Sequence, residues 1–435
     1  MKYIELKESN QIRKFPLKIL MGLLIFTELL FAFGPQIYRT DNIPMTIAYL
    51  FLNNLALIYG YYFYLRSVEK KVIIRKDTRD SHNIRLIKSL LILTILFTPI
   101  RIKALWDINP FNIIGVLHHI IQALFSPGEV YETKLEFQSS LITYVNMFIN
   151  IIVYISLSSG LFYYKHLDKK WKYTIIFLLL IEILLPLGQG VRKGILDTIL
   201  LVFFLAVASN PKIILNKQIR RRLYIYAGFA SFAFLAYFIF SNMSRYGIED
   251  LEILTQGTNM YSNVKAFYRN LNPIILVSLC SIQGYACQGY YALSLALQMP
   301  YEFCYFLGSS WFGINLSHRI GIDVFSNTYI YRLSSKGIDP TINWHSIYTW
   351  LADDLTFVLV PFFIFLIGYF FAKAWDDTLN NRSVFAPPTF FFFSIMVFYS
   401  FANNQVFSLM FIPFVTTFIL WLVDRKKIIC LKSSL

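Results

Sequence analysis

Apolar runs of bilayer-spanning length, separated by short polar links, fill most of this 435-residue sequence. A helix needs about 20 predominantly apolar residues to cross the hydrocarbon core of a membrane. Hydrophobic residues make up 56% of the chain and charged residues 15%, whereas soluble domains carry about 25% charged residues. The sequence therefore predicts an all-α polytopic membrane protein. About ten transmembrane helices are expected, over 16–33, 44–65, 86–100, 141–164, 173–187, 195–209, 223–241, 355–375, 387–401 and 405–423.

Lysine and arginine residues divide unevenly between the links. When the links are assigned alternately to two sides, 28 of the 40 basic residues fall on the side of the two tails and 12 on the other. Basic residues are retained on the cytoplasmic side of a membrane. We therefore expect both termini in the cytoplasm and one large outward-facing loop between the seventh and eighth helices. Because topology accounts for most of the net charge of +15, no nucleic-acid partner is expected.

The chain divides into three parts on this basis. Seven helices occupy 1–241, the large outer loop covers 242–354, and three helices with a basic tail occupy 355–435. Within the loop, residues 273–297 are apolar but contain two Gln-Gly pairs at their centre. An eleventh crossing here would move the basic C-terminal tail to the outside. We therefore expect this segment to lie on the outer membrane surface or to re-enter the membrane.

Cysteine and histidine are too sparse to suggest a metal centre. Cys280, Cys287 and Cys304 lie in the outer loop, which allows at most one disulfide there, and Cys430 lies in the tail. No paired-cysteine or histidine-rich spacing typical of a zinc site occurs in the sequence. We expect neither a metal nor a cofactor.

A basic, glycine-rich break separates the fifth and sixth predicted helices. Pro186 and three glycines end a helix here, and the freed backbone amides together with Arg192 and Lys193 would suit an anion. Alternatively, the break is a tight turn whose basic side chains contact lipid headgroups. Three further arginines on the same side could complete a phosphate pocket, although each is singly typical of a surface charge. These are Arg101, Arg245 and Arg319.

Polar residues also gather just before the eighth predicted helix. His345 and Asp354 are candidates for a general base, and Asp353 lies beside the second of them. Alternatively, Asp354 caps the helix that follows. Two acids within predicted spans, Glu28 and Glu182, are expected to be paired inside the bundle or to lie near water.

Two parts of the outer loop resemble a known family. The run Gln283-Gly284-Tyr285 and the stretch from Gln288 through Tyr290 and Tyr291 to Leu297 resemble a segment of Wzy-type O-antigen polymerases. The later stretch, with Asn343, Tyr348, Thr349, Asp354 and Gly368, is similar to a second pattern of that family. Leu355 and Thr356 stand where that pattern often has Phe-Gly.

The resemblance implies a glycosyltransferase in the inner membrane of a Gram-negative bacterium, with its active site and large loop in the periplasm. It would transfer a growing polysaccharide from undecaprenyl pyrophosphate to the non-reducing end of a new lipid-linked repeat unit, with inversion and without a metal. Lipid-linked donor and acceptor, membrane lipid and a chain-length regulator are the partners considered. Asp354 or His345 would be the base, the arginines and Lys193 would bind pyrophosphate, and Gln288, Tyr290, Tyr291 and Asn343 would contact sugars. An O-antigen ligase and a non-enzymatic flippase or transporter remain the alternatives.

Overall fold

Helices dominate the computed structural model, which describes residues 2–75, 81–126, 130, 141–191, 193–246, 261–340, 343, 345–402 and 404–433. The α-helices are α1 (Leu6–Arg13), α2 (Phe15–Phe33), α3 (Ile43–Val68), α4 (Ser81–Trp106), α5 (Ile113–Phe125), α7 (Leu141–Phe162), α8 (Lys169–Leu187), α9 (Lys193–Ser209), α10 (Lys212–Leu215), α11 (Lys217–Tyr246), α13 (Pro273–Ala296), α14 (Trp311–Arg319), α15 (Tyr329–Arg332), α16 (Ile347–Leu379), α17 (Ala386–Phe398) and α18 (Phe411–Ser433). Short 3-10 helices occur at η1 (Tyr164–His166), η2 (Ala266–Tyr268), η3 (Phe325–Asn327), η4 (Leu333–Lys336) and η5 (Gln405–Phe407). Two antiparallel strand pairs join β1 (Lys2–Ile4) to β3 (Ile73–Arg75) and β2 (Gln36–Tyr38) to β4 (Tyr261–Val264).

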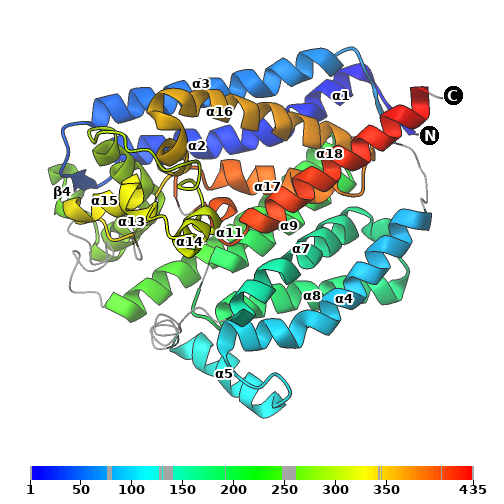
Figure 1. The fold of residues 1–435 in the computed structure, drawn as a ribbon, viewed down its shortest axis with the longest axis horizontal. Helices are drawn as coiled ribbons and strands as arrows, with labels where there is room; N and C mark the ends of the chain where they lie inside the picture. The colour runs from blue at the N-terminus through cyan, green and yellow to red at the C-terminus, as the bar shows by residue number, and fades with distance from the viewer. Residues whose placement is uncertain are drawn as a thin grey trace.

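The long helices form a bundle whose two ends differ (Figure 1). Helices α2, α3 and α16 run together along one side, and α4, α7 and α8 run along the other, with α9, α17 and α18 between them. The N- and C-termini lie at one end of the bundle. Helices α13, α14 and α15, which come from the predicted outer loop, gather at the opposite end with β4. We call these the terminal end and the loop end.

Each predicted apolar segment coincides largely with a helix, although the spans predicted over 141–164, 387–401 and 405–423 extend beyond α7, α17 and α18. Five helical stretches are long and apolar enough to cross a membrane: Leu6–Phe33, Ile43–Val68, His82–Trp106, Tyr144–Phe162 and Ile347–Leu379. The chain is therefore a helical membrane protein. Crossing by the other predicted spans, and the side on which each end lies, stay predictions.

Helix α16 is interrupted near its start. Thr356 has φ 61° and ψ 155°, so the element consists of a short half over 347–355 and a longer half over 357–379. A positive φ is costly for a β-branched residue, because its side chain then crowds the backbone. The predicted eighth span began at Leu355, so the sequence placed its start beside this break without predicting the short helix that precedes it.

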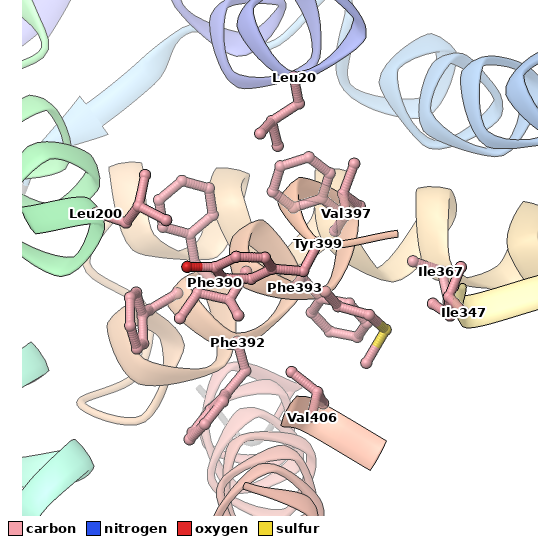
Figure 2. Close-up of a cluster of buried hydrophobic side chains, with 14 of the residues drawn as sticks. Leu20, Leu200, Ile347, Ile367, Phe390, Phe392, Phe393, Val397, Tyr399 and Val406 are labelled. Carbon is pink, nitrogen blue, oxygen red and sulfur yellow. The ribbon is translucent and has the colours of Figure 1, made fainter. Parts of the chain in front are cut away.

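Helix α17 forms the centre of the bundle. Its twelve residues from Ala386 to Val397 are all buried, and Figure 2 shows Phe390, Phe392 and Phe393 projecting from it among side chains of neighbouring elements, such as Leu20 and Leu200. The helix has 13 residues, which corresponds to about 20 Å at a rise of 1.5 Å per residue. It is therefore shorter than the predicted span over 387–401 and ends well short of the ~30 Å thickness of a bilayer core.

Helix α13 contains the segment expected at the membrane surface. It is continuous from Pro273 to Ala296, and it contacts α2, β2 and α3 as well as α11, α16 and η4. The Gln36 amide N–H donates to Gln283 at 2.8 Å, and Asn42 donates to the Ser294 carbonyl at 2.9 Å. The helix thus packs where the chain turns between α2 and α3. Its position relative to a membrane stays a prediction.

Helix α5 was absent from the sequence prediction, because its 13 residues are too few for a span. One face is strongly apolar and exposed, including Ile113, Ile114 and Phe125. On the other face, His119 hydrogen-bonds the Gly188 carbonyl at 2.7 Å. The helix therefore lies against the glycine-rich break with an apolar face outward.

Charged side chains are paired at the terminal end. Arg13 donates from Nε to Asp376 at 2.8 Å, and Asp377 accepts from Arg382 at 2.7 Å and from Arg425 at 2.8 Å. Both aspartates are completely buried. This group, the terminal ion cluster, connects α1, α16 and α18 with the link after α16.

Candidate functional site

The two segments that carry the family resemblance are in direct contact at Gly289. A Cβ atom at this position would lie 2.2 Å from the Phe401 carbonyl oxygen and 2.8 Å from the Ser346 backbone nitrogen. Cβ contacts below 3.0 Å are essentially never observed. Only glycine therefore allows α13 to approach this closely to the chain before α16 and to the chain after α17.

The end of α17 and the start of α16 are hydrogen-bonded to each other. The Ile347 backbone N–H donates to the Ser400 carbonyl at 3.0 Å, and Ser346 caps α16 by accepting from the Thr349 N–H at 3.4 Å. We call this contact the helix junction. Sequence analysis did not single out 399–401. The available signal was the polar run Asn403-Asn404-Gln405, which separates two apolar segments.

His345 is buried beside the helix junction. It is 3% exposed, and neither ring nitrogen has a hydrogen-bond partner among the described residues. Burial lowers the pKa of His345 from its usual 6.5 to about 4. The imidazole is therefore neutral at pH 7, and burial disfavours its protonated form.

Asn343 lies two residues before this histidine in the sequence and is also buried. Its Oδ1 accepts from the Asp339 backbone N–H at 2.6 Å, whereas its Nδ2 has no partner in the part of the chain that the structure describes. Buried polar groups are nearly always hydrogen-bonded. Unpaired atoms on two neighbouring polar side chains therefore mark this segment as a candidate binding site.

The two aspartates of the short helix contact backbone amides of the loop end. The Asp354 carboxylate accepts from Gly308 N at 3.0 Å and from Ser309 N at 2.8 Å. Asp353 accepts from Tyr329 N at 2.6 Å, and its second oxygen has no partner among the described residues. Asp354 therefore caps backbone of a distant loop instead of its own helix. Its role as a general base stays a prediction.

The loop fixed by Asp354 exposes aromatic rings. Phe303, Tyr305 and Phe306 are 46%, 54% and 69% exposed. Tyr305 and Phe306 have φ of 54° and 58°, a conformation that non-glycine residues rarely adopt. Such strain persists only where surrounding contacts impose it, and it is often found at functional sites. The hydrogen bonds from Gly308 and Ser309 to Asp354 are contacts of this kind.

The side chains of the α13 run pack inside the protein. Gln288 and Tyr290 are completely buried, and Tyr291 is nearly so. The Tyr290 hydroxyl hydrogen-bonds Thr27 at 3.1 Å, and the Tyr291 ring stacks on Tyr38 with centroids 5.3 Å apart. Their predicted contacts with sugars are not tested by this packing. The structure shows them joining α13 to α2 and β2.

Two of the predicted cationic residues are already paired with acids. Arg101 forms a bidentate ion pair with Glu182, so this acid lies paired inside the bundle. Lys193 contacts both oxygens of Asp197, at 3.0 and 2.8 Å, and its Nζ lies 4.0 Å from the centroid of the Tyr399 ring. The basic break is thus connected to the end of α17 and to the helix junction.

Of the other predicted arginines, Arg319 is the one whose side chain the structure describes. Arg319 is exposed and lies over the Tyr144 ring at 4.8 Å. Arg192, like Trp344, lies outside the described residues, and so does the side chain of Arg245. Their predicted phosphate contacts stay predictions.

Comparisons of the chain with protein-family models, with curated proteins and with solved structures found no match. A functional proposal for this chain therefore rests on its residue patterns and on their spatial arrangement.

Proposed function

We propose that this chain is a membrane glycosyltransferase that polymerises lipid-linked oligosaccharide repeat units, as Wzy-type O-antigen polymerases do. It would act on the periplasmic side of a Gram-negative inner membrane. One observation supports the proposal most. The two segments that resemble the family, far apart in the sequence, pack together at Gly289, where a Cβ atom would lie 2.8 Å from the Ser346 nitrogen.

In this proposal His345 is the general base. Its neutral imidazole has two unpaired nitrogens among the described residues, whereas both oxygens of Asp354 accept backbone N–H groups. His345 removes the proton from the acceptor hydroxyl as the hydroxyl oxygen attacks the anomeric carbon of the donor. The bond from that carbon to the pyrophosphate breaks at the same time, and the pyrophosphate leaves with the bonding electrons. A single displacement of this kind inverts the anomeric centre.

Asp354 has a positioning role in the same proposal. It holds the strained loop that presents Phe303, Tyr305 and Phe306, and these exposed rings offer apolar faces to sugar rings. Because His345 is 3% exposed, the acceptor reaches it only when the surrounding segments separate.

The donor pyrophosphate would bind near the basic break. Arg192 and Lys193 belong to the basic break between α8 and α9, and Arg101 lies in α4, which packs against α8. The pairs Arg101–Glu182 and Lys193–Asp197 keep these cations neutralised before substrate binds, which reduces the cost of burying them. A chain-length regulator stays a proposed protein partner.

Deletion of the gene in the bacterium that encodes it tests the activity directly. We expect lipopolysaccharide that carries a single repeat unit, because extension is lost while ligation continues. Gel separation of the lipopolysaccharide, with a plasmid-borne wild-type copy as control, reports the result. Loss of every repeat unit, including the first, would contradict polymerisation and favour a ligase or flippase.

A further inference from the structure

Helix α5 presents a continuous apolar face to the outside of the protein. Spacings of three and four residues place side chains on one face of a helix. Six apolar residues of α5 are related by such spacings, and each is between 41% and 81% exposed: Ile113, Ile114, Leu117, Ile121, Leu124 and Phe125. Contiguous exposed apolar surface of this kind marks a contact with a partner or with a membrane.

The other two faces of α5 differ from the first. His118 and Gln122 are polar and exposed, and they lie four residues apart on a second face. The third face packs against the protein, where Ala123 is completely buried and His119 hydrogen-bonds the Gly188 carbonyl at 2.7 Å. A helix with one apolar, one polar and one packed face fits the boundary between hydrocarbon and water.

The end of α4 marks where this boundary lies. The stretch His82–Trp106 is long and apolar enough to cross a membrane, and it exposes apolar side chains such as Leu96. At its end, Lys103 and Asp107 form an exposed ion pair at 2.7 Å, and charges are costly inside the hydrocarbon. Trp106 lies beside them, and tryptophan is enriched where a helix leaves the membrane. Helix α5 follows directly and lies at the edge of the molecule beside this end of α4 (Figure 1), so its apolar face continues the exposed apolar surface of α4.

Trp106 also connects α5 to the basic break. Its indole N–H donates to the Leu185 carbonyl at 2.9 Å, and its ring centroid lies 5.1 Å from that of His119. A Cβ atom at Gly188 would lie 2.3 Å from the Trp106 ring, so glycine is required for this packing. The end of α4, helix α5 and the basic break therefore form one packed unit.

Charge is absent from α5 itself. Its 13 residues include no Lys, Arg, Asp or Glu. Helices that lie on a membrane through anionic headgroups carry Lys and Arg on their polar face. Attraction to the apolar face of α5 must instead come from burial of apolar area. This chemistry fits lipid acyl chains, whatever their headgroup, and does not fit a charged partner.

We propose that α5 is an interfacial helix whose apolar face inserts among lipid acyl chains at the membrane surface. His118 and Gln122 then face the water. The bilayer itself is the partner, and anionic headgroups are not required. Because His119 binds the Gly188 carbonyl, the inserted helix also holds the basic break at the depth of the membrane surface. This role does not depend on the glycosyltransferase activity.

The test uses the full-length protein in nanodiscs of neutral phosphatidylcholine. The fluorophore NBD is attached to one introduced cysteine, either Ile114→Cys on the apolar face or Gln122→Cys on the polar face, with Cys430→Ser in both. The other three cysteines are buried, and the Cys430→Ser protein alone gives the background labelling. We expect phosphatidylcholine brominated on its acyl chains to quench the probe of Ile114→Cys several-fold more than that of Gln122→Cys. Iodide in the water should show the reverse order.

Two further variants keep the test decisive. Phe125→Cys lies at the other end of the apolar face and should give the result expected of Ile114→Cys, even if that variant fails to fold. Leu96→Cys, exposed on the crossing helix α4, calibrates quenching by lipid. Strong iodide quenching of the apolar-face probes would show that α5 faces water, and protection from both quenchers would show that protein covers it. Either result would overturn the proposal, as would lipid quenching that appears only after anionic phosphatidylglycerol is added.

Discussion

Buried acidic side chains form ion pairs at the terminal end of the bundle but not, among the described residues, at the loop end. At the terminal end, Asp376 and Asp377 are completely buried, and each accepts from guanidinium groups within 3.1 Å. At the loop end, Asp353 and Asp354 are also buried, at 1% and 7% exposure, yet they form no ion pair with any described residue and accept from backbone amides. His345 there has two ring nitrogens without a partner in the described chain.

The difference in pairing indicates which end has a structural role and which end has a functional one. Complete pairing stabilises one arrangement of α1, α16 and α18, and a substrate has nothing to add to it. Unpaired buried groups cost free energy in the folded protein, and such a cost persists where a ligand or a reaction uses the groups. We therefore interpret the terminal ion cluster as structural and the 343–354 segment as the site.

Removing a carboxylate from the terminal ion cluster should have the largest effect on stability. Asp376→Ala leaves Arg13, which is 1% exposed, without its carboxylate. Breaking a buried pair in this way typically costs about 3–5 kcal/mol. Membrane abundance and unfolding in detergent should both fall. Asp168→Ala, which removes an exposed pair with Lys88, should change stability by at most about 1 kcal/mol, and a similar loss in both variants would refute the contrast.

Acid should destabilise the loop end through His345. Its pKa is about 4 in the folded protein and 6.5 without burial. Below pH 6.5 the unfolded chain binds a proton that the folded chain does not, so stability is lost as the pH falls from 6.5 through 4. The full loss is about 3 kcal/mol. Unfolding of wild type and His345→Gln between pH 7.5 and 4.5 measures it, and the same pH dependence in both proteins would count against a buried neutral imidazole.

Overpacking at Gly289 should separate the two resembling segments. Gly289→Ala places a methyl group against the Phe401 carbonyl and the Ser346 amide, and overpacking typically costs about 1–3 kcal/mol. The variant should unfold at lower temperature and polymerise poorly. Gly228→Ala, where no atom lies within 4 Å of the added group, should be neutral or slightly stabilising. Equal behaviour of the two variants would show that α13 does not approach the helix junction this closely.

Asp354→Asn should have a modest effect on stability and separates a positioning role from a chemical one. Asparagine has one acceptor oxygen in place of two, so either Gly308 or Ser309 loses its partner at a cost of about 1–3 kcal/mol. Hydrogen exchange of these amides should therefore accelerate, with activity reduced in proportion. Lost activity with unchanged exchange would instead identify Asp354 as the base.

Sequence patterns predicted the apolar helices because length and composition determine them. They misjudged elements whose ends depend on packing: α17 stops after Phe398 because its end meets the start of α16, and the short helix over 347–355 is separated from its continuation by Thr356. Sequence could not show this contact, since nothing local requires Ser400 to accept from Ile347.

The candidate site shows the same limit. Asn343, His345 and Asp354 were predicted from residue type and from the family-like pattern, whereas their contacts depend on the packing of distant segments. Arg101 and Lys193 were predicted to bind a phosphate, and the structure pairs them with Glu182 and Asp197. Lys193 and Asp197 lie four residues apart in α9, a spacing that the sequence shows, whereas the pairing of Arg101 in α4 with Glu182 in α8 depends on tertiary packing.

The most direct test of the central claim is polymerisation by His345→Gln. Purified wild type and variant are reconstituted in liposomes with undecaprenyl-pyrophosphate-linked repeat units, and product length is followed on gels. A positioned general base typically contributes about 10²- to 10⁴-fold to the rate, so the variant should insert and fold normally and polymerise slower by about that factor. A His345→Gln protein that elongates chains at the wild-type rate would contradict the account.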